Sequence, residues 1–249
     1  MKIISHRGFS SKAPENTFSS FDMAISNGFN IIEFDVQLTK DLVPVIMHDE
    51  EIDRTTDSNG ILSEIEHKDL LKFDAGIWFD KKFKNERVPT LIDLLRKYEG
   101  KAHLQIELKS VEPELPLLTI DLIKKTKWRN VSNEYPYMIP GFSITSFNLD
   151  HILKTIEIEK HFPVGWLLEK EKISKNKILN VISDYQVKMI ILNVNDSLWN
   201  DQDFIELLKA RNIKLCAWGA QVFSDVKKML KAGAAAMTVD WPDEAIKFI

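Results

Sequence analysis

The chain has 249 residues, of which 44% are hydrophobic, and a formal net charge of −4. This length and apolar content suit one α/β domain with a full core. The weak charge, without long runs of one sign, excludes the basic surfaces typical of proteins that bind nucleic acid or anionic membranes.

The sequence also carries no sign of export or of membrane insertion. No apolar run approaches the roughly 18 residues that span a bilayer, and no signal-peptide pattern precedes the first strand-like segment. Cys216 is the single cysteine, so an internal disulfide is impossible. We therefore expect a cytoplasmic protein without a membrane span.

Short apolar runs alternate with amphipathic stretches along the whole chain. Strands are predicted at Ile3–Ser5, Ile31–Val36, Leu104–Leu108, Tyr137–Ser143, Phe162–Leu167, Met189–Asn193, Ile213–Trp218 and Ala235–Val239. Helices are predicted at Asn16–Ser26, Thr90–Tyr98, Glu114–Lys127, Asn148–Glu159, Lys172–Asp184, Asp201–Arg211, Ser224–Ala232 and Pro242–Ile249. This alternation predicts a parallel sheet. The favoured fold is a single (β/α)8 TIM-barrel domain over residues 1–249, and an open doubly wound sheet is the alternative.

Two departures from a simple barrel are expected. Val43–Met47 is a further strand-like run, and a turn centred on Lys40 and Asp41 would pair it with the second strand as a hairpin. That turn would place His48 opposite Glu33. A polar, irregular segment follows at residues 53–87, and a connection of this length in a compact domain is usually functional. We interpret it as an insertion over the mouth of the barrel.

Two predicted strands place charged side chains two residues apart. Glu33 and Asp35 lie on one strand, and Glu107 and Lys109 on another; residues i and i+2 of a strand share a face. His6 with Arg7, and also His48, follow the ends of two other strands. Taken singly, each motif is more often an ordinary solvated face than a catalytic site. Together they indicate a site, because charges at strand ends are costly to bury without partners.

The chemistry of these residues favours a phosphate ester and a hard cation. Glu33, Asp35 and Glu107 suit one divalent ion, Mg²⁺ or Ca²⁺, which prefer carboxylate oxygens. Arg7 and Lys109 suit a phosphate. His6 and His48 can serve as general acid and general base. His6 and His48 complete the charged part of the predicted site.

The order of motifs resembles the glycerophosphodiester phosphodiesterase family over essentially the whole chain. The similarity is carried by His6-Arg7-Gly8, Pro14-Glu15-Asn16-Thr17, Glu33-Phe34-Asp35-Val36, Pro44-Val45-Ile46-Met47-His48-Asp49, Asp53-Arg54-Thr55-Thr56, Ile106-Glu107-Leu108-Lys109 and Thr238-Val239-Asp240-Trp241-Pro242. The resemblance implies a barrel with a small insertion and metal-dependent hydrolysis of glycerophosphodiesters to sn-glycerol 3-phosphate and an alcohol. It also implies the same metal ligands and the same two histidines.

The chain departs from the family pattern near its end. Trp218-Gly219-Ala220-Gln221 stands where the family usually has Trp-Thr-Val-Asn, which concerns the shape of the substrate pocket. Trp218 is predicted either to line that pocket against the glycerol carbons or to be core. Asn16 is predicted to cap the first helix; the resemblance also places Glu15 and Asn16 near the site, which leaves a supporting polar contact as the alternative. Two rival functions remain: a lysophospholipase D-like activity, and a non-catalytic metal- and phosphate-binding barrel. The oligomeric state is not predicted.

Overall fold

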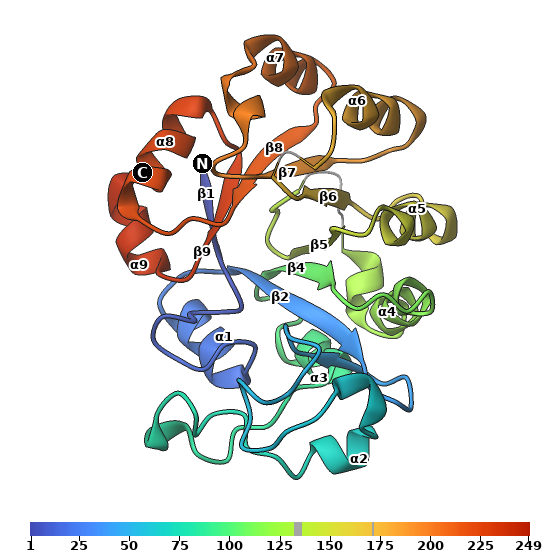
Figure 1. Ribbon diagram of the computed structural model, residues 1–249, viewed down its shortest axis with the longest axis vertical. Helices are drawn as coiled ribbons and strands as arrows, with labels where there is room; N and C mark the ends of the chain where they lie inside the picture. The colour runs from blue at the N-terminus through green and yellow to red at the C-terminus, as the bar shows by residue number, and fades with distance from the viewer. Residues whose placement is uncertain (132–135, 171) are drawn as a thin grey trace.

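The computed structural model describes residues 1–131, 136–170 and 172–249 of the protein. Within these residues, nine strands form one sheet that helices surround (Figure 1). The strands are β1 (Lys2–Ser5), β2 (Ile31–Leu38), β3 (Pro44–Ile46), β4 (His103–Leu108), β5 (Gly141–Ser146), β6 (Val164–Leu168), β7 (Met189–Asn193), β8 (Lys214–Trp218) and β9 (Ala236–Val239). The α-helices are α1 (Phe18–Ser26), α2 (His67–Leu70), α3 (Leu91–Lys97), α4 (Leu115–Lys124), α5 (Leu149–Ile158), α6 (Lys175–Asp184), α7 (Gln202–Ala210), α8 (Phe223–Ala232) and α9 (Pro242–Ala245).

The sheet closes on itself through the first and last strands. β1 pairs in parallel with β9, from Lys2 opposite Ala236 to Ser5 opposite Val239, and Ser5 also lies opposite Ile32 of β2. All other neighbouring strands are parallel except β3, which pairs antiparallel with β2. The predicted (β/α)8 barrel is therefore confirmed, with β3 as an added hairpin strand. No described helix is long and apolar enough to span a bilayer.

Each barrel strand presents two faces of different character. On β2, Ile32, Phe34 and Val36 belong to the large core between the strands and the surrounding helices, where Phe34 packs on Phe21 of α1 at 5.9 Å between ring centroids. The intervening Glu33 belongs to the other face, because side chains alternate along a strand. Truncating a buried aromatic such as Phe34 to alanine typically costs about 3–5 kcal/mol. The outer core thus holds β2 in the orientation that turns its carboxylates inward.

The hairpin register differs by one residue from the prediction. Val36 lies opposite Ile46, and the backbone N–H of Met47 donates to the carbonyl of Asp35 at 3.0 Å. The connection is one residue longer than expected, and Leu42 adopts a positive φ of 58° within it. His48 consequently does not lie opposite Glu33. His48 directly follows Met47, which forms the last hydrogen bond between the two strands. Beyond the hairpin, His48 lies at the barrel mouth instead.

The fourth barrel strand, β5, begins later than predicted. The expected strand Tyr137–Ser143 corresponds to β5 at Gly141–Ser146. Tyr137 has a positive φ of 66°, and Pro140 lacks the N–H that a ladder requires. Tyr137 is buried although it lies outside the strand, because its side chain enters the barrel, where its hydroxyl lies 3.2 Å from Sγ of Cys216.

Residues 53–87 pack beside β3, at the lower edge of Figure 1. Their apolar side chains, including Leu62 and Leu70, form a small separate core with Val45 and Met47. None of the described residues of this segment lines the central cavity of the barrel mouth. The segment therefore lies beside β3, where its apolar residues are buried, and stays outside the lining of that cavity.

Candidate active site

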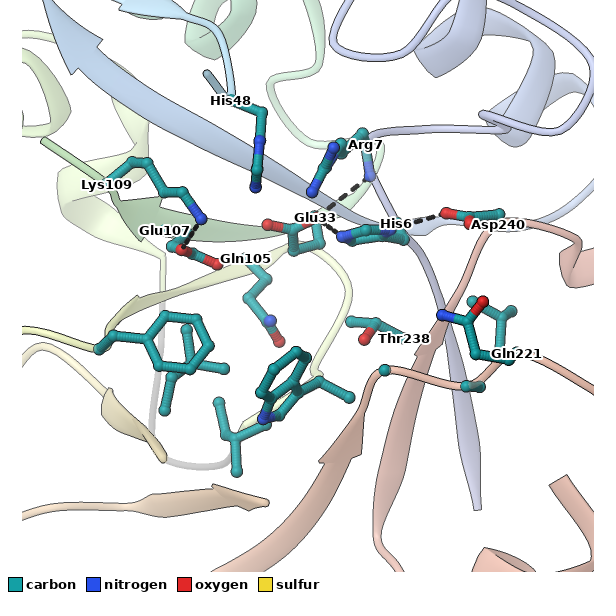
Figure 2. Close-up of a pocket in the computed structure, with 17 residues that line it drawn as sticks. His6, Arg7, Glu33, His48, Gln105, Glu107, Lys109, Gln221, Thr238 and Asp240 are labelled. Carbon is teal, nitrogen blue, oxygen red and sulfur yellow. Dashed lines mark hydrogen bonds and ion pairs between the residues drawn. The ribbon is translucent and has the colours of Figure 1, made fainter. Parts of the chain in front are cut away.

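A cavity of about 250 Å³ opens at the carboxyl ends of the barrel strands (Figure 2). Its polar lining includes His6, Arg7, Glu33, His48, Gln105, Glu107, Lys109, Gln221, Thr238 and Asp240, and its apolar lining includes Phe147, Leu167, Ile191 and Trp218. Every residue predicted for the site lines this cavity except Asp35, which lies in the carboxylate cluster at its wall. The closed barrel brings these residues together, because parallel strands end at one edge.

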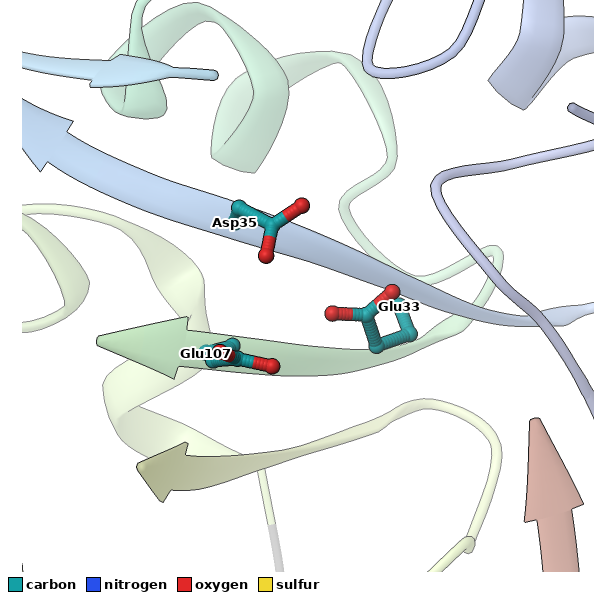
Figure 3. Close-up of side chains that lie close together, drawn as sticks. All are labelled: Glu33, Asp35 and Glu107. Atoms are coloured by element: carbon teal, nitrogen blue, oxygen red, sulfur yellow. The ribbon is translucent and has the colours of Figure 1, made fainter. Parts of the chain in front are cut away.

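The carboxylates of Glu33, Asp35 and Glu107 form a buried cluster (Figure 3). Glu33 and Asp35 come from β2, and Asp35 lies directly opposite Glu107 of β4 in the sheet. One oxygen from each carboxylate lies within 4.8 Å of the others. The exposed fractions of the three residues are 2%, 1% and 8%. The pairing of β2 with β4 therefore converts two separate sequence motifs into one acidic centre.

Burial and mutual repulsion shift the titration of this cluster. Burial, with the charge of Asp35, raises the pKa of Glu33 to about 8 and that of Glu107 to about 7. Burial would also raise the pKa of Asp35, but the positive charges of Arg7, His48 and Lys109 and the hydrogen bond from Asn16 together outweigh it, so the pKa of Asp35 is lowered. Two of the three groups are thus held in an environment that disfavours their charged forms.

The donor set fits one hard divalent cation. Oε1 of Glu33 is buried and has no hydrogen-bond partner among the described residues. Ca²⁺–oxygen distances of roughly 2.3–2.6 Å allow one ion to reach ligands with this spacing. A cation would satisfy the orphaned oxygen and remove the repulsion between the carboxylates. The cluster thus has the chemistry of an oxygen-ligand metal site.

Arg7 lies between this cluster and a second set of charges. Its backbone N–H donates to Oε2 of Glu33 at 3.1 Å, and its Nε lies 3.2 Å from Oδ2 of Asp35. Gly8 follows with a φ of 83°, and a Cβ there would lie 2.4 Å from Oγ of Ser20, so the turn requires glycine. This turn aims the guanidinium of Arg7 into the site.

Lys109 borders the cluster from β4's carboxyl end. Its Nζ lies 3.2 Å from Oε1 of Glu107 and 3.9 Å from Oδ1 of Asp35. Burial would lower the pKa of Lys109, but the charges of Glu107 and Asp35 and the hydrogen bond to Glu107 together outweigh this effect, so the pKa is raised. Lys109 and Arg7 therefore remain cationic and supply two positive charges at the cavity.

Each histidine is held by its own carboxylate. Nδ1 of His6 lies 2.7 Å from Oδ1 of Asp240, and Nδ1 of His48 lies 2.6 Å from Oδ1 of Asp49. In both, Nε2 is the ring nitrogen left for the cavity, and Nε2 of His6 lies 4.0 Å from Oε2 of Glu33. Burial lowers the pKa of His48. Burial acts in the same direction on His6, but the hydrogen bond to Asp240 and the charges of Glu33 and Asp240 together outweigh it, so the pKa of His6 is raised.

Asn16 does not cap the first helix. The N-cap of α1 is Thr17, whose side chain accepts from the N–H of Ser20, an arrangement typically worth about 1 kcal/mol. The amide of Asn16 instead donates to Oδ2 of Asp35 at 2.9 Å, and its Oδ1 accepts from the Asp35 backbone at 3.4 Å. Asn16 has a φ of 58°, which turns it away from the helix and toward the carboxylate.

A second, more open cavity of about 380 Å³ adjoins the first. The two share Glu107, Lys109, Phe147 and Trp218. The indole N–H of Trp218 donates to the carbonyl of Leu168 at 3.1 Å, and its ring meets Phe147 edge to face at 5.2 Å. Trp218 therefore lines the pocket, and this aromatic pair stands between the two cavities.

Known proteins resemble this chain over nearly its whole length. The sequence matches the Glycerophosphoryl diester phosphodiesterase family over residues 6–244. It is 32% identical over 248 residues to a glycerophosphodiester phosphodiesterase of Caldanaerobacter subterraneus, covering 99% of this chain and 97% of that protein.

The chain belongs to the glycerophosphodiester phosphodiesterase family.

Solved structures of this family share the fold. A phosphodiesterase of Oleispira antarctica in complex with the product sn-glycerol-3-phosphate superposes with a TM-score of 0.83 at 25% identity, over 99% of this chain and 97% of that one. A glycerophosphodiester phosphodiesterase of Agrobacterium tumefaciens gives a TM-score of 0.79 at 26% identity, over 98% and 97%. The family places this chain among the phosphoric diester hydrolases.

Several polar residues that contact the predicted site were missed by sequence reasoning. Asp240, Asp49 and Arg54 each form an ion pair within or beside the phosphodiesterase site. All three lie within motifs of the family resemblance, but no local pattern assigns them a partner. His6 and Asp240, for example, are separated by 234 positions. Only the closure of β9 onto β1 brings such groups together.

Proposed function

We propose that this protein hydrolyses glycerophosphodiesters to sn-glycerol 3-phosphate and an alcohol in a reaction that depends on one divalent cation and two histidines. The observation that carries the proposal is the position of two carboxylate-held histidines at a cavity that also contains the acidic cluster, Arg7 and Lys109. A barrel that had lost catalysis would be expected to lack at least one of these groups.

Glu33, Asp35 and Glu107 would hold the cation, Mg²⁺ or Ca²⁺, which when bound would polarise a phosphoryl oxygen. Arg7 and Lys109 then contribute fixed positive charge beside the phosphate. Such preorganised charge stabilises the negative charge that builds on the phosphoryl oxygens in the transition state. Arg7 in addition offers the planar donor fork that matches phosphate oxygens.

His6 and His48 divide the proton transfers. One Nε2 accepts the proton of the attacking hydroxyl, and the other donates a proton to the departing alkoxide. The Asp240 and Asp49 carboxylates hold Nδ1 of each ring, which fixes the orientation of Nε2. The attacking group is either water or the glycerol 2-hydroxyl, which would give a cyclic phosphate that water then opens. A substrate that lacks the 2-hydroxyl separates these routes.

The alcohol of the diester would occupy the second cavity. A volume of about 250 Å³ for the first cavity falls below the roughly 300–1,000 Å³ typical of ligand sites, so a whole diester needs more room. The adjoining cavity of about 380 Å³ supplies it, past the aromatic pair Phe147 and Trp218. In this arrangement glycerol phosphate would lie at the charged groups, and the alcohol would point toward the open side.

The test is release of sn-glycerol 3-phosphate from a panel of glycerophosphodiesters and one lysophospholipid. We expect exhaustive EDTA treatment to abolish release and Mg²⁺ or Ca²⁺ to restore it. Undiminished activity after chelation and dialysis would contradict the role of the cation. Turnover of the lysophospholipid in preference to every water-soluble diester would favour the lysophospholipase D-like activity instead.

A further inference from the structure

A continuous chain of charged groups runs along one side of the cavity. It begins at His48, passes through Asp49, Arg54 and Glu15, and ends at Arg7. It therefore connects one of the two histidines to one of the two cations of the proposed mechanism. The other histidine is held differently, because its carboxylate accepts from the hydroxyl of a serine, Ser10, at 2.8 Å.

Arg54 is the central member of this chain. Its Nε lies 2.5 Å from Oδ2 of Asp49, while its Nη1 and Nη2 donate to the two oxygens of Glu15 at 2.7 and 2.8 Å. One planar guanidinium thus engages two carboxylates, one of them through two parallel hydrogen bonds. The geometry is specific to arginine, since the ammonium of lysine cannot present this fork.

The same two carboxylates also hold the reactive groups. Oδ1 of Asp49 lies 2.6 Å from Nδ1 of His48, and Oε1 of Glu15 accepts from Nη1 of Arg7 at 2.7 Å. Burial would raise the pKa of both carboxyls, but the hydrogen bonds and charges of Arg54, together with those of His48 for Asp49 and of Arg7 for Glu15, outweigh it. They lower the pKa of Asp49 to about 2 and also lower that of Glu15. Both acids therefore stay ionised as acceptors.

We propose that Arg54 is a positioning residue that sets the orientation of His48 and Arg7 together. The inference rests on the proposed function, in which the rate depends on the orientation of His48 and Arg7. Arg54 comes from the segment at residues 53–87, so the first turn of that segment serves the site although the rest packs beside β3. Misplacement of a reacting group by about 1 Å can cost roughly 10²-fold in rate.

A purely structural role for Arg54 predicts a different pattern. Its side chain is 45% exposed, and exposed ion pairs typically contribute little to folding stability. Loss of Arg54 should therefore change the rate much more than the melting temperature. Loss of a merely structural contact would change the melting temperature first and the rate only through the folded fraction.

The experiment compares Arg54→Ala, Arg54→Lys and the control Arg87→Ala with the parent. Arg87 lies in the same segment and donates to two backbone carbonyls, those of Phe73 and Glu86, so its loss reports on the segment alone. We expect Arg54→Ala to lower kcat about 10–100-fold and to raise KM, with the melting temperature within about 2 °C of the parent. Arg54→Lys should recover only part of the loss, and Arg87→Ala should leave kcat and KM near those of the parent.

A double-mutant cycle with His48→Ala completes the test. Because Arg54 acts on kcat through His48, the double variant should have nearly the kcat of His48→Ala, while the higher KM contributed through Arg7 should persist. If His48→Ala loses activity but Arg54→Ala stays within twofold, the positioning role is wrong and the proposed function stands. If His48→Ala retains full activity, the proposed function itself fails. Fully multiplicative losses, or a loss in Arg54→Ala that follows the unfolded fraction, also overturn the positioning role.

Discussion

The interior of the barrel contains two polar regions of opposite character. At the mouth, charged groups gather around the cavity, and a buried oxygen of Glu33 has no hydrogen-bond partner among the described residues. Deeper in the barrel, neutral groups pair with one another. His103 contacts the carbonyl of Met138 at 3.0 Å and the hydroxyl of Ser143 at 3.1 Å.

The difference separates residues that serve stability from residues that serve chemistry. A neutral, hydrogen-bonded group can be buried at little cost, whereas mutually repelling carboxylates destabilise the fold unless a ligand offsets the repulsion. Variants of the mouth should therefore lose activity without losing stability, and variants of the deeper region should do the reverse. Each prediction below tests one side of this contrast.

The largest effect is expected for Glu107→Gln. Loss of a carboxylate ligand should weaken cation binding, and loss of the Lewis acid's several kcal/mol should lower turnover on the order of 10⁴-fold. Since the change also removes one repelling charge, the variant in EDTA should melt at or above the temperature of the parent. Calorimetric titration with Ca²⁺ and Mg²⁺, with thermal melts, measures both effects.

The matched control for this prediction is Glu99→Gln, which makes the same change at a carboxylate that pairs with Lys127 away from the cavity. It should bind the cation as the parent does. If Glu107→Gln also bound the cation with unchanged affinity, Glu107 would not be a ligand.

His6→Ala and His48→Ala should each lower turnover by about 10²–10⁴-fold while cation affinity stays near that of the parent. The carboxylates hold the ion, whereas the imidazoles move protons. The two losses should not multiply in the double variant, because groups that act as a unit are non-additive. Steady-state rates for sn-glycerol 3-phosphate release provide the measurement.

A nitrophenyl ester of glycerol phosphate assigns the two roles. Its leaving group needs little protonation, so it should rescue the variant that lacks the general acid and leave the other impaired. If neither histidine variant lost more than a few-fold on any substrate, the two-histidine mechanism would be wrong.

The deeper region should make the free energy of unfolding depend on pH. Burial lowers the pKa of His103 to about 4 from an ordinary value of 6.5, so the unfolded chain binds this proton at a higher pH than the folded protein. Neutral His103 therefore contributes fully to the free energy of unfolding above pH 6.5. This contribution, about 3 kcal/mol, is lost as the pH falls toward 4. Urea unfolding of the parent and of His103→Gln at pH 7 and 4.5, in EDTA, measures the difference.

Only the change with pH enters this comparison, so any constant cost of the substitution cancels. The free energy of unfolding should fall more steeply in the parent than in His103→Gln, and kcat at pH 7 should be similar in both. Equal pH dependence in the two proteins would show that His103 is not buried in its neutral form.

The contrast also explains what could be read from the sequence. Alternation along β2 and β4 is a local property, so the faces of Glu33, Asp35 and Glu107 follow from spacing of two residues. The barrel follows from eight alternations of strand and helix. The hairpin register was wrong because it depends on one extra residue in the turn, and a slip of one residue changes every pairing.

Contacts between distant segments could not be read in this way. The carboxylate that holds His6 comes from the opposite end of the chain, and Asn16 contacts Asp35 only because a positive φ turns it away from the helix it was expected to cap. The apolar run before Gly141 suggested a strand but places one tyrosine, Tyr137, inside the barrel. Local patterns do not encode these long-range placements.

Trp218 lies in the wall between the two cavities at the mouth, and the smallest effect is expected there. An aromatic contact contributes about 0.5–1.5 kcal/mol beyond the area it buries, which corresponds to up to roughly tenfold in binding. Trp218→Leu should therefore raise KM up to about tenfold and leave kcat nearly unchanged, because the ring contacts substrate equally in the ground and transition states. Phe147→Leu should act in the same direction, since the two rings pack on each other. Phe79→Leu, whose ring packs on Trp78 and Phe83 in the segment beside β3, is the control and should alter neither constant. A fall in kcat at constant KM would instead show that Trp218 acts on the transition state. The aromatic wall of the cavity would then contribute to catalysis as the charged residues do.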